Sequence, residues 1–252
     1  MGERTSPELT VVIPVYNEAK ILEASLEELC ERLTAEGLAY EVILAENGSR
    51  DDTVAIAAAI ATRRPQVSSF SYPEPNYGGA LREGIRRAQG TFVVCEEIDI
   101  CDVDFHLRAL ALLRPGEADM VIGSKAMRGA EDTRPFVRRF ATRVYNFALR
   151  LALGFRGTDT HGLKAFRRAA VIEVAERCIV EHDVFASELV VRAQREGVDV
   201  REIPVVIEEK RAPSIHLFRR VPRVLKNLGR LTWAIRFGGR SQPSRARDRA
   251  GQ

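Results

Sequence analysis

Two carboxylates follow an apolar run near the middle of the chain. Glu97 and Asp99 flank Ile98, directly after the segment Thr-Phe-Val-Val-Cys at 91–95. Because alternate residues of an extended strand point to the same side, we expect Glu97 and Asp99 to project together where a buried strand ends. Paired carboxylate oxygens suit Mg²⁺ or Mn²⁺ bound to substrate phosphates. The triplet therefore predicts a site for one of these ions and a phosphate-bearing substrate.

Three further polar clusters stand where apolar, strand-like runs end. They follow the runs at 9–16, 40–45 and 69–72. In an open α/β sheet, ligands bind beyond the carboxyl ends of the strands. Each cluster alone is better explained as a solvated turn, but four clusters at successive strand ends favour a shared nucleotide site. The residues expected to contact that substrate are Pro14, Tyr16, Asn17, Glu18, Glu46, Asn47, Gly48, Asn76, Gly79 and Ile98.

The elements that must position these residues alternate between strand-like and helix-like segments. β-branched apolar runs predict strands, and apolar residues three and four positions apart predict helices, as at Leu22, Leu26 and Leu29. Expected strands cover 9–16, 40–45, 69–72, 91–95, 119–123, 162–166 and 198–206, and expected helices cover 19–33, 52–63, 80–88, 105–113, 134–155 and the region around Glu188. The alternation predicts the α/β class, with a mostly parallel central sheet flanked by helices.

The composition limits the class of protein. The chain has 252 residues, of which 45% are hydrophobic and 29% charged, and this predicts one main domain with a sizeable core. Its four cysteines lack CxxC spacing, which argues against a zinc site or a disulfide framework. The N-terminus lacks the features of a signal peptide, and no uncharged apolar run approaches about 18 residues. We therefore expect a cytoplasmic protein.

Positive charge is concentrated towards the C-terminus. The net charge is +3, yet residues 210–252 contain twelve Lys or Arg and one acid. We expect a catalytic domain over 1–210, a basic amphipathic helical segment over 211–240 and a disordered tail over 241–252. Arginine in such a tail can bind nucleic acid nonspecifically, and we expect no specific nucleic-acid partner.

The helix expected within the basic segment is amphipathic. From Leu217 to Ile235, apolar residues recur at alternating spacings of four and three, with Lys and Arg on the other faces. Such a helix can lie on an anionic membrane, where each basic residue near the surface adds about 1 kcal/mol. The same stripe could instead pack on the protein body or form a dimer seam, and the helix at 134–155 offers the same choices. Peripheral attachment to the inner face of the cell membrane and homo-oligomerisation both stay open.

Six motifs occur in an order that resembles a known enzyme family. They are Val-Ile-Pro-Val-Tyr-Asn-Glu at 12–18, Glu-Asn-Gly-Ser-Arg-Asp-Asp-Thr at 46–53, Asn-Tyr-Gly-Gly-Ala-Leu at 76–81, Glu-Ile-Asp at 97–99, Gly-Ser-Lys at 123–125 and Asp-Thr-His-Gly-Leu-Lys-Ala-Phe-Arg-Arg at 159–168. The sequence resembles the inverting family 2 glycosyltransferases of GT-A fold, particularly the polyprenyl-phosphate mannosyl- and glucosyltransferases. The resemblance covers roughly residues 8–220, and the triplet at 97–99 falls where the family carries Asp-x-Asp.

The resemblance implies transfer of a sugar from a nucleotide-sugar of the GDP-mannose or UDP-glucose type to a polyprenyl-phosphate lipid. It implies that Glu97 and Asp99 hold the metal on the diphosphate and that Lys125 helps to organise the phosphates. Three more cations are available to bind these phosphates, namely Lys164, Arg211 and Arg219. The Gln-x-x-Arg-Trp hallmark of processive synthases in this family is missing, so we do not expect chain elongation.

Two departures from the family pattern leave an alternative function open. Glu97 stands in place of Asp, and Glu46-Asn47 replaces two aspartates at the turn expected to recognise the base. These changes motivate a catalytically silent sugar-nucleotide-binding protein as one alternative.

The nature of the acceptor is a second open question. A hydroxyl acceptor usually needs a carboxylate that acts as general base and removes its proton, whereas a phosphate acceptor is already anionic. The candidate bases are Asp132, Asp183 and Glu188. None of the three stands out, which favours a phosphate acceptor over a hydroxyl acceptor.

Overall fold

The computed structural model describes residues 6–132, 136–181, 184–207 and 217–237. The predicted boundary at 210–211 and the predicted tail at 241–252 lie outside these residues. The domain limits therefore stay a prediction.

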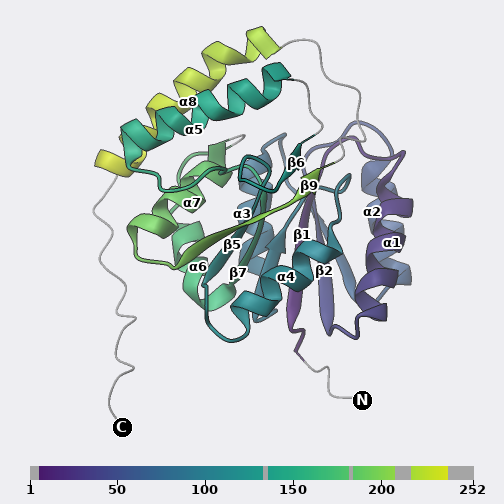
Figure 1. Ribbon diagram of the computed structural model, residues 1–252. Helices are drawn as coiled ribbons and strands as arrows, with labels where there is room; N and C mark the ends of the chain where they lie inside the picture. The colour runs from purple at the N-terminus through teal and green to yellow at the C-terminus, as the bar shows by residue number, and fades with distance from the viewer. Residues whose placement is uncertain (1–5, 133–135, 182–183, 208–216, 238–252) are drawn as a thin grey trace.

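A seven-stranded sheet with the order β3-β2-β1-β4-β7-β5-β8 forms the centre of the molecule (Figure 1). Its strands are β1 (Leu9–Val15), β2 (Tyr40–Glu46), β3 (Val67–Ser71), β4 (Phe92–Cys95), β5 (Met120–Ser124), β7 (Leu163–Arg167) and β8 (Val200–Pro204). All neighbouring strands are parallel except β7, which runs antiparallel to both β4 and β5. The predicted mostly parallel sheet is confirmed.

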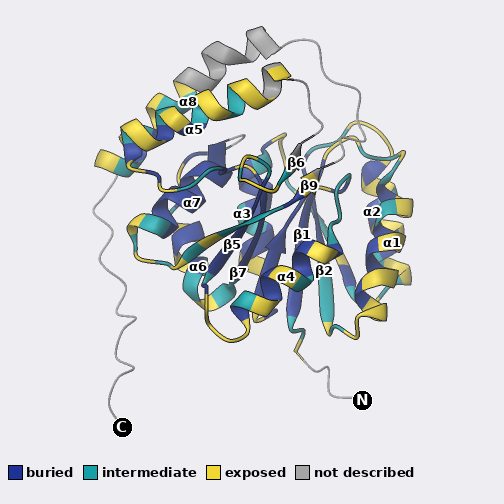
Figure 2. Cartoon of the chain, viewed as in Figure 1, coloured by how far each residue is buried: buried dark blue, intermediate teal, exposed yellow. Residues whose placement is uncertain are grey.

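Helices cover both faces of this sheet. One face carries α1 (Leu22–Ala35), α2 (Thr53–Arg63) and α4 (Val103–Leu113), and the other carries α3 (Tyr77–Arg87), α6 (Arg168–Glu176) and α7 (Phe185–Arg195). Alternate residues of β1 serve the two layers, because Val11 and Ile13 pack with the first group while Val12 packs with the second. Figure 2 shows the buried residues concentrated in the strands and on the helix faces turned towards them.

Two long helices lie side by side at the end of the molecule towards which the parallel strands point (Figure 1). They are α5 (Phe136–Leu153) and α8 (Leu217–Phe237). Leu231 and Ala234 of α8 are buried in the second core cluster, so in this half of α8 the apolar stripe packs on the body, as one of the predicted alternatives had it. None of the helices in the described ranges is both long and apolar enough to cross a membrane.

Local contacts explain where the expected elements shift. The first helix begins at Leu22 instead of residue 19, because the backbone N–H groups of Glu18 and Ala19 are bonded to side chains of the next loop. The third helix begins at Tyr77, three residues earlier than expected, because the Asn76 side chain caps it by accepting from Gly79 N. Residues 131–132, expected in a polar loop, form β6 (Glu131–Asp132), which pairs with β9 (Val206–Ile207). The α6 helix was not predicted.

The register of β7 brings distant motifs together. Lys164 lies opposite Cys95 of β4, and Leu163 lies opposite Gly123 of β5. Gly162, just before β7, approaches β5 so closely that a Cβ atom on it would lie 1.9 Å from the Gly123 carbonyl oxygen. The motifs at 123–125 and 159–168 thus pack directly on each other, and only glycine fits at position 162.

We predict that Gly162→Ala lowers the free energy of unfolding by about 1–3 kcal/mol, because the added methyl group has to displace the β5 backbone. Chemical denaturation measures the change. Gly229→Ala is the matched control, since a Cβ there meets nothing within 4 Å and α8 gains a better helix former. Equal stability of the two variants would contradict the close approach of Gly162 to β5.

Candidate active site

The carboxylates at 97–99 lie on a turn rather than on a strand. β4 ends at Cys95, and the N–H groups of Ile100 and Cys101 bond to the carbonyl oxygen of Glu97 at 3.0 and 3.4 Å. The expectation that strand alternation aligns the two carboxylates is therefore wrong. Ile98 is buried in the core and anchors the turn, while Glu97 is exposed and Asp99 half-buried. The turn itself presents both acids at the edge of the sheet.

A buried glutamate–histidine pair stabilises this turn. The Oε2 atom of Glu96 lies 3.0 Å from Nε2 of His106, and both side chains are fully buried. The same oxygen accepts from the N–H of Asp102 at 3.1 Å, which ties the end of β4 to the first turn of α4 across the acidic triplet. Sequence reasoning missed Glu96 and His106. The signal was weak, since Glu96 reads as one more acid in an acidic run.

The loops after β1 and β2 hold each other. Asn17, which has a left-handed backbone with φ 56°, donates its N–H to Ser49 Oγ at 3.0 Å and accepts from Arg50 N at 2.8 Å through Oδ1. Glu18 N donates to Thr53 Oγ1 at 2.8 Å. Pro14 is buried within β1, whereas Tyr16 is exposed where the strand ends. Tyr16 and Asn17 are therefore the residues of this group whose side chains are exposed to a ligand.

Three polar residues expected to contact the nucleotide are largely buried. Glu46 accepts from Ser49 N, and the side-chain oxygen of Asn47 accepts from Asn76 N. Asn76 in turn bonds to Gly79 N and to Glu181 Oε2, both at 2.9 Å. Buried polar groups need such partners, and here they shape the two loops. The loop backbone is thus left as the surface for a ligand.

Two of the expected glycines are required for different steric reasons. Gly48 has φ +72°, in the left-handed region, so the turn after β2 favours glycine. Gly79, which was expected in a turn, lies in the first turn of α3. A Cβ on it would lie 2.8 Å from the Tyr72 hydroxyl.

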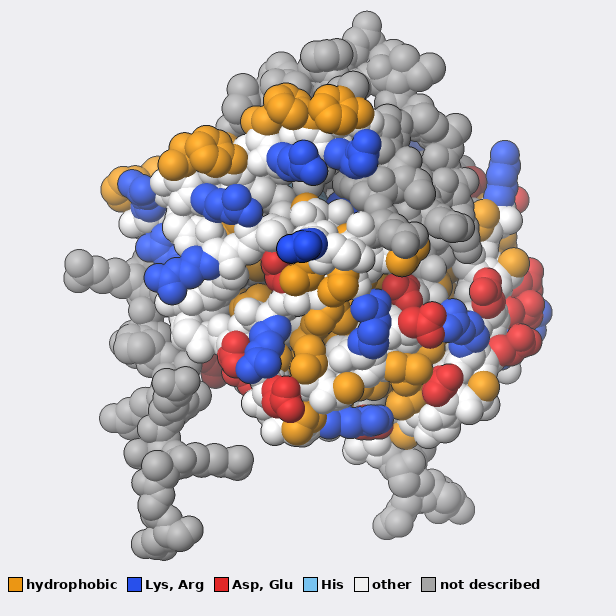
Figure 3. Space-filling model, in the orientation of Figure 1, with side chains coloured by type: hydrophobic (Ala, Val, Ile, Leu, Met, Phe, Trp, Pro, Cys, Tyr) orange, Lys and Arg blue, Asp and Glu red, His pale blue; other side chains and the backbone are white. Residues whose placement is uncertain are grey.

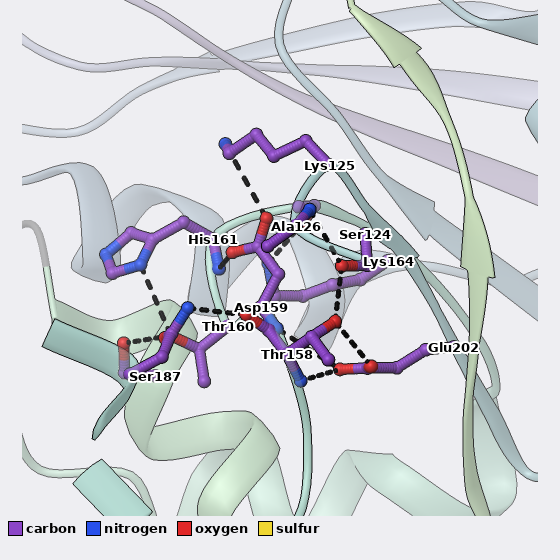
Figure 4. Close-up of polar contacts among 12 residues, drawn as sticks. Ser124, Lys125, Ala126, Thr158, Asp159, Thr160, His161, Lys164, Ser187 and Glu202 are labelled. Atoms are coloured by element: carbon purple, nitrogen blue, oxygen red, sulfur yellow. Dashed lines mark hydrogen bonds and ion pairs between the residues drawn. The ribbon is translucent and has the colours of Figure 1, made fainter. Parts of the chain in front are cut away.

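Cationic side chains gather beside the acidic turn. Lys164 is buried and donates from Nζ to the Gly162 carbonyl oxygen at 2.7 Å. Lys125, just after β5, has its Nζ 3.9 Å from Oδ2 of Asp159, whose side chain is fully buried (Figure 4). Burial is the main cause that lowers the pKa of Lys164 to about 8, and the carboxylates of Asp159 and Glu97 act in the opposite direction. These four charged groups form one electrostatic cluster.

The loop carrying Asp159 is fastened to the sheet by one carboxylate. Glu202 of β8 accepts from Thr158 N and Thr158 Oγ1, both at 2.7 Å, and from Asp159 N at 3.2 Å (Figure 4). The hydroxyl of Thr158 also lies 2.6 Å from that of Ser124. Sequence reasoning quoted Asp159 within a motif without assigning it to the site, and it missed Glu202. No local pattern in the sequence links Glu202 to a loop 43 residues earlier in the chain.

The structure places the candidate bases and the remaining predicted cations in different settings. Glu188 is buried, with Oε1 2.7 Å from Arg192 Nε and Oε2 accepting from Ile179 N and Val180 N. Its carboxylate is fully engaged in packing α7, so we no longer propose it as a base. Asp183 and Arg211 lie outside the described residues. Asp132 lies in β6 and Arg219 in α8.

The donor set fits a divalent ion that is shared with a substrate. Within the described ranges, no group of three or more His, Cys, Asp or Glu could hold a metal ion by itself. Glu97 and Asp99 supply hard carboxylate oxygens on one turn, as Mg²⁺ or Mn²⁺ prefers. The remaining ligands have to come from elsewhere, and phosphate oxygens of a bound substrate satisfy the same preference.

Lys164 predicts a pH dependence of stability. Because folding lowers its pKa from 10.5 to about 8, the folded protein binds fewer protons than the unfolded chain between these values, and this group makes stability rise with pH there. We expect Lys164→Met to abolish a rise of about 3 kcal/mol over that window, measured by chemical denaturation at successive pH values. Lys20→Met, at an exposed position, is the control. An unchanged pH profile in Lys164→Met would contradict the effect of burial.

Known proteins resemble this chain in sequence. The family model described as Glycosyl transferase family 2 matches residues 10–175. Glycosyltransferase AglD from Haloferax volcanii is 33% identical over 90% of this chain and 37% of its own length. Dolichyl-phosphate beta-glucosyltransferase ALG5C from Trichomonas vaginalis is 28% identical over 78% of this chain and 62% of its own length. Undecaprenyl-phosphate 4-deoxy-4-formamido-L-arabinose transferase from Pseudomonas aeruginosa is 32% identical over 65% of this chain and 48% of its own length. The chain thus spans less than two thirds of each relative.

Solved structures share the fold. Glucosyl-3-phosphoglycerate synthase from Mycobacterium tuberculosis, with Mn²⁺, UDP and glucosyl-3-phosphoglycerate, has a TM-score of 0.64 and 19% identity, over 90% of this chain and 80% of its own. The mannosyltransferase PcManGT from Pyrobaculum calidifontis, in complex with GDP-Man and Mn²⁺, has a TM-score of 0.62 and 22% identity. The match covers 95% of this chain and 67% of that protein. The predicted GT-A fold and enzyme class are confirmed: the chain belongs to glycosyl transferase family 2.

Proposed function

We propose that this chain transfers a sugar, with inversion, from a nucleotide-sugar to a polyprenyl phosphate at a membrane surface, with the help of Mg²⁺ or Mn²⁺. The observation that carries the proposal is the meeting of two carboxylates and two lysines at the carboxyl edge of the sheet. The names of the relatives support a polyprenyl-phosphate acceptor, and the ligands of the solved structures support a nucleotide donor with a divalent ion.

The donor would lie along the loops after β1, β2 and β3. Tyr16 and the backbone of the Gly48 turn would contact the nucleoside, since both have surface or N–H groups at the sheet edge. Glu97 and Asp99 would hold the ion against the diphosphate, and that ion supplies Lewis-acid stabilisation of the departing nucleoside diphosphate. We propose a donor of the GDP-mannose or UDP-glucose type.

The acceptor phosphate would lie on the opposite side of the sugar, near Lys125 and Lys164. A phosphate is an anionic nucleophile, so the reaction needs cations to hold it more than a base to activate it. Attack on the anomeric carbon from the side away from the leaving diphosphate inverts the configuration. Lys125 lies between the Asp159 carboxylate and solvent, where it can neutralise the phosphate during this approach.

An exposed apolar face supports the lipid part of the proposal. The outer side of α5 carries five large apolar residues that are between 51% and 70% exposed. They are Phe136, Phe140, Val144, Phe147 and Leu151. On α8, Trp233 and Phe237 are exposed as well, at 62% and 73%. We call these seven residues the apolar face. Figure 3 shows orange side chains along α5 with blue Lys and Arg side chains beside them.

The apolar face has the chemistry of a membrane-surface contact. When a lipid interface covers large apolar side chains that are this exposed, the free energy of the system falls. Arg139 and Arg143 of α5 and Lys226 and Arg230 of α8 are exposed, so they are available to meet anionic headgroups. We therefore propose peripheral binding to the inner face of the cell membrane, with α5 providing most of the contact. The sequence had placed this contact chiefly in the 217–235 helix.

We predict that Asp99→Asn lowers transfer at least about 100-fold and weakens Mn²⁺-dependent nucleotide binding, because one charged oxygen ligand is lost. The measurements are transfer to polyprenyl phosphate and thermal shift with GDP- or UDP-sugars, with and without Mn²⁺. Asp104→Asn, at an exposed position on α4, is the control. Unchanged turnover of every accepted donor by Asp99→Asn would contradict the metal role. Transfer to hydroxyl acceptors but to no lipid phosphate would overturn the proposed acceptor.

We predict that the double variant Phe140→Ser/Phe147→Ser binds anionic vesicles about tenfold or more weakly, because two exposed aromatic rings are lost from the apolar face. Cosedimentation with vesicles measures the binding, which should also weaken as salt is raised. Val54→Ser, an exposed apolar position on α2, is the control. Full vesicle binding by the double variant would exclude α5 as the lipid contact.

A further inference from the structure

α5 has a second side that faces the catalytic centre. Leu149 and Leu153 are buried in the core cluster beneath the helix, and Asn146, on the same side, is 2% exposed. The apolar face points the opposite way. One helix therefore separates the proposed lipid surface from the loop that carries Asp159, and every polar side chain on its inner side is a potential link between the two.

The inner side of α5 contacts this loop at successive residues. Arg150 donates from Nε and from its terminal nitrogen to the Gly157 carbonyl oxygen at 3.1 and 2.7 Å. Asn146 Nδ2 donates to the Thr158 carbonyl oxygen at 2.6 Å. The Tyr145 ring meets the His161 ring edge-on, with centroids 5.3 Å apart. The contacts lie on both sides of Asp159.

A chain of hydroxyl groups adds a further link. Tyr145 donates from its hydroxyl to Ser187 Oγ at 3.0 Å, and Ser187 Oγ lies 2.9 Å from Thr160 Oγ1. Thr160 Oγ1 also lies 3.2 Å from Nδ1 of His161 (Figure 4). Thr160 and Ser187 are buried, so these contacts are not exchanged with bulk water. Ser187 of α7 thus contacts Thr160 directly, and Tyr145 of α5 reaches Thr160 through Ser187.

The opposite side of the loop is fixed by the sheet. Glu202 of β8 receives three hydrogen bonds from Thr158 and Asp159, and Gly162 is wedged against β5. The loop therefore lies between a rigid strand layer and α5. A shift of α5 would change its contacts with residues 157, 158 and 161 and leave those of Glu202 in place, so it would act on the loop on both sides of Asp159.

We propose that α5 couples seating on an anionic lipid surface to the position of the 157–161 loop, and that Asn146 and Tyr145 are positioning residues for the acceptor phosphate. This inference rests on the proposed function. The partner that we propose for the outer side of α5 is a lipid surface. Five exposed apolar residues lie there beside arginines, and this combination complements an anionic interface. An enzyme built in this way transfers sugar to the same phosphate group more efficiently when α5 rests on lipid.

Asn146 offers a variant that separates positioning from stability. The amide nitrogen of Asn146 donates to the Thr158 carbonyl oxygen, whereas its buried amide oxygen has no hydrogen-bond partner among the described residues. Leucine has the same number of side-chain heavy atoms and the same branching as asparagine, and it leaves no unsatisfied side-chain oxygen in this buried place. Asn146→Leu should therefore fold, yet it releases the Thr158 carbonyl from α5.

The experiment uses the full chain and a short, water-soluble prenyl phosphate as acceptor, with and without empty anionic vesicles. We expect the vesicles to raise kcat/KM of the unmodified protein on the order of tenfold, because the loop becomes better placed for reaction. Asn146→Leu should lose this stimulation through a higher KM for the acceptor. It should keep vesicle cosedimentation and the thermal shift given by nucleotide with Mn²⁺. Tyr145→Phe, which loses only the hydroxyl link to Ser187, should lose part of the stimulation.

Thr10→Val is the matched control for loss of a buried polar group. Thr10 bonds to Glu41 at 2.6 Å and to Gly90 N at 2.8 Å at the opposite edge of the sheet, so this variant should be less stable but fully stimulated. Full stimulation of Asn146→Leu, or vesicle binding by the unmodified protein without stimulation, would overturn the coupling alone. Failure of the unmodified protein to use any lipid phosphate would overturn the proposed function itself.

Discussion

The site depends on one strand that runs against the rest of the sheet. β7 lies antiparallel between β4 and β5, so its first residues stand at the edge where the parallel strands end. This pairing sets Lys164 beside Cys95 and packs Gly162 against Gly123, which brings the 157–162 loop to the acidic turn. A parallel strand in the same place would have put that loop at the opposite edge, away from every ligand-binding loop of the fold.

Burial divides the polar residues of the site into supports and contacts. Glu46, Asn47 and Glu96 lie so deep that their hydrogen bonds serve neighbouring loops, because a buried polar group without a partner is costly. Glu97 and Tyr16 remain exposed. The replacement of acidic residues at 46–47 is therefore better understood as a change in how two loops are held together.

α5 belongs to two environments at once. Its outer side exposes large apolar residues beside arginines, and its inner side holds the 157–161 loop through Asn146 and Arg150. α8 reinforces this position, since Arg236 donates to the Ala152 carbonyl oxygen at 3.1 and 2.7 Å. One helix thus supports both the exposed apolar surface and the loop that carries Asp159.

The amino-acid sequence was sufficient to predict the α/β class, most of the elements and the family, because strand and helix periods and ordered motifs are local patterns. It singled out Glu97 and Asp99, although for a reason of strand geometry that the turn at 98–100 invalidates. The fold was needed to show that Glu188 pairs with Arg192 in a buried place, that Asp159 and Glu202 lie with Lys125, and that α5 carries most of the exposed apolar face. The Glu188–Arg192 pair is local to α7, and only the packing of that helix buries it. The contacts of Asp159 with Lys125 and Glu202 join residues far apart in the chain, and the packing of β7 against β5 brings them together.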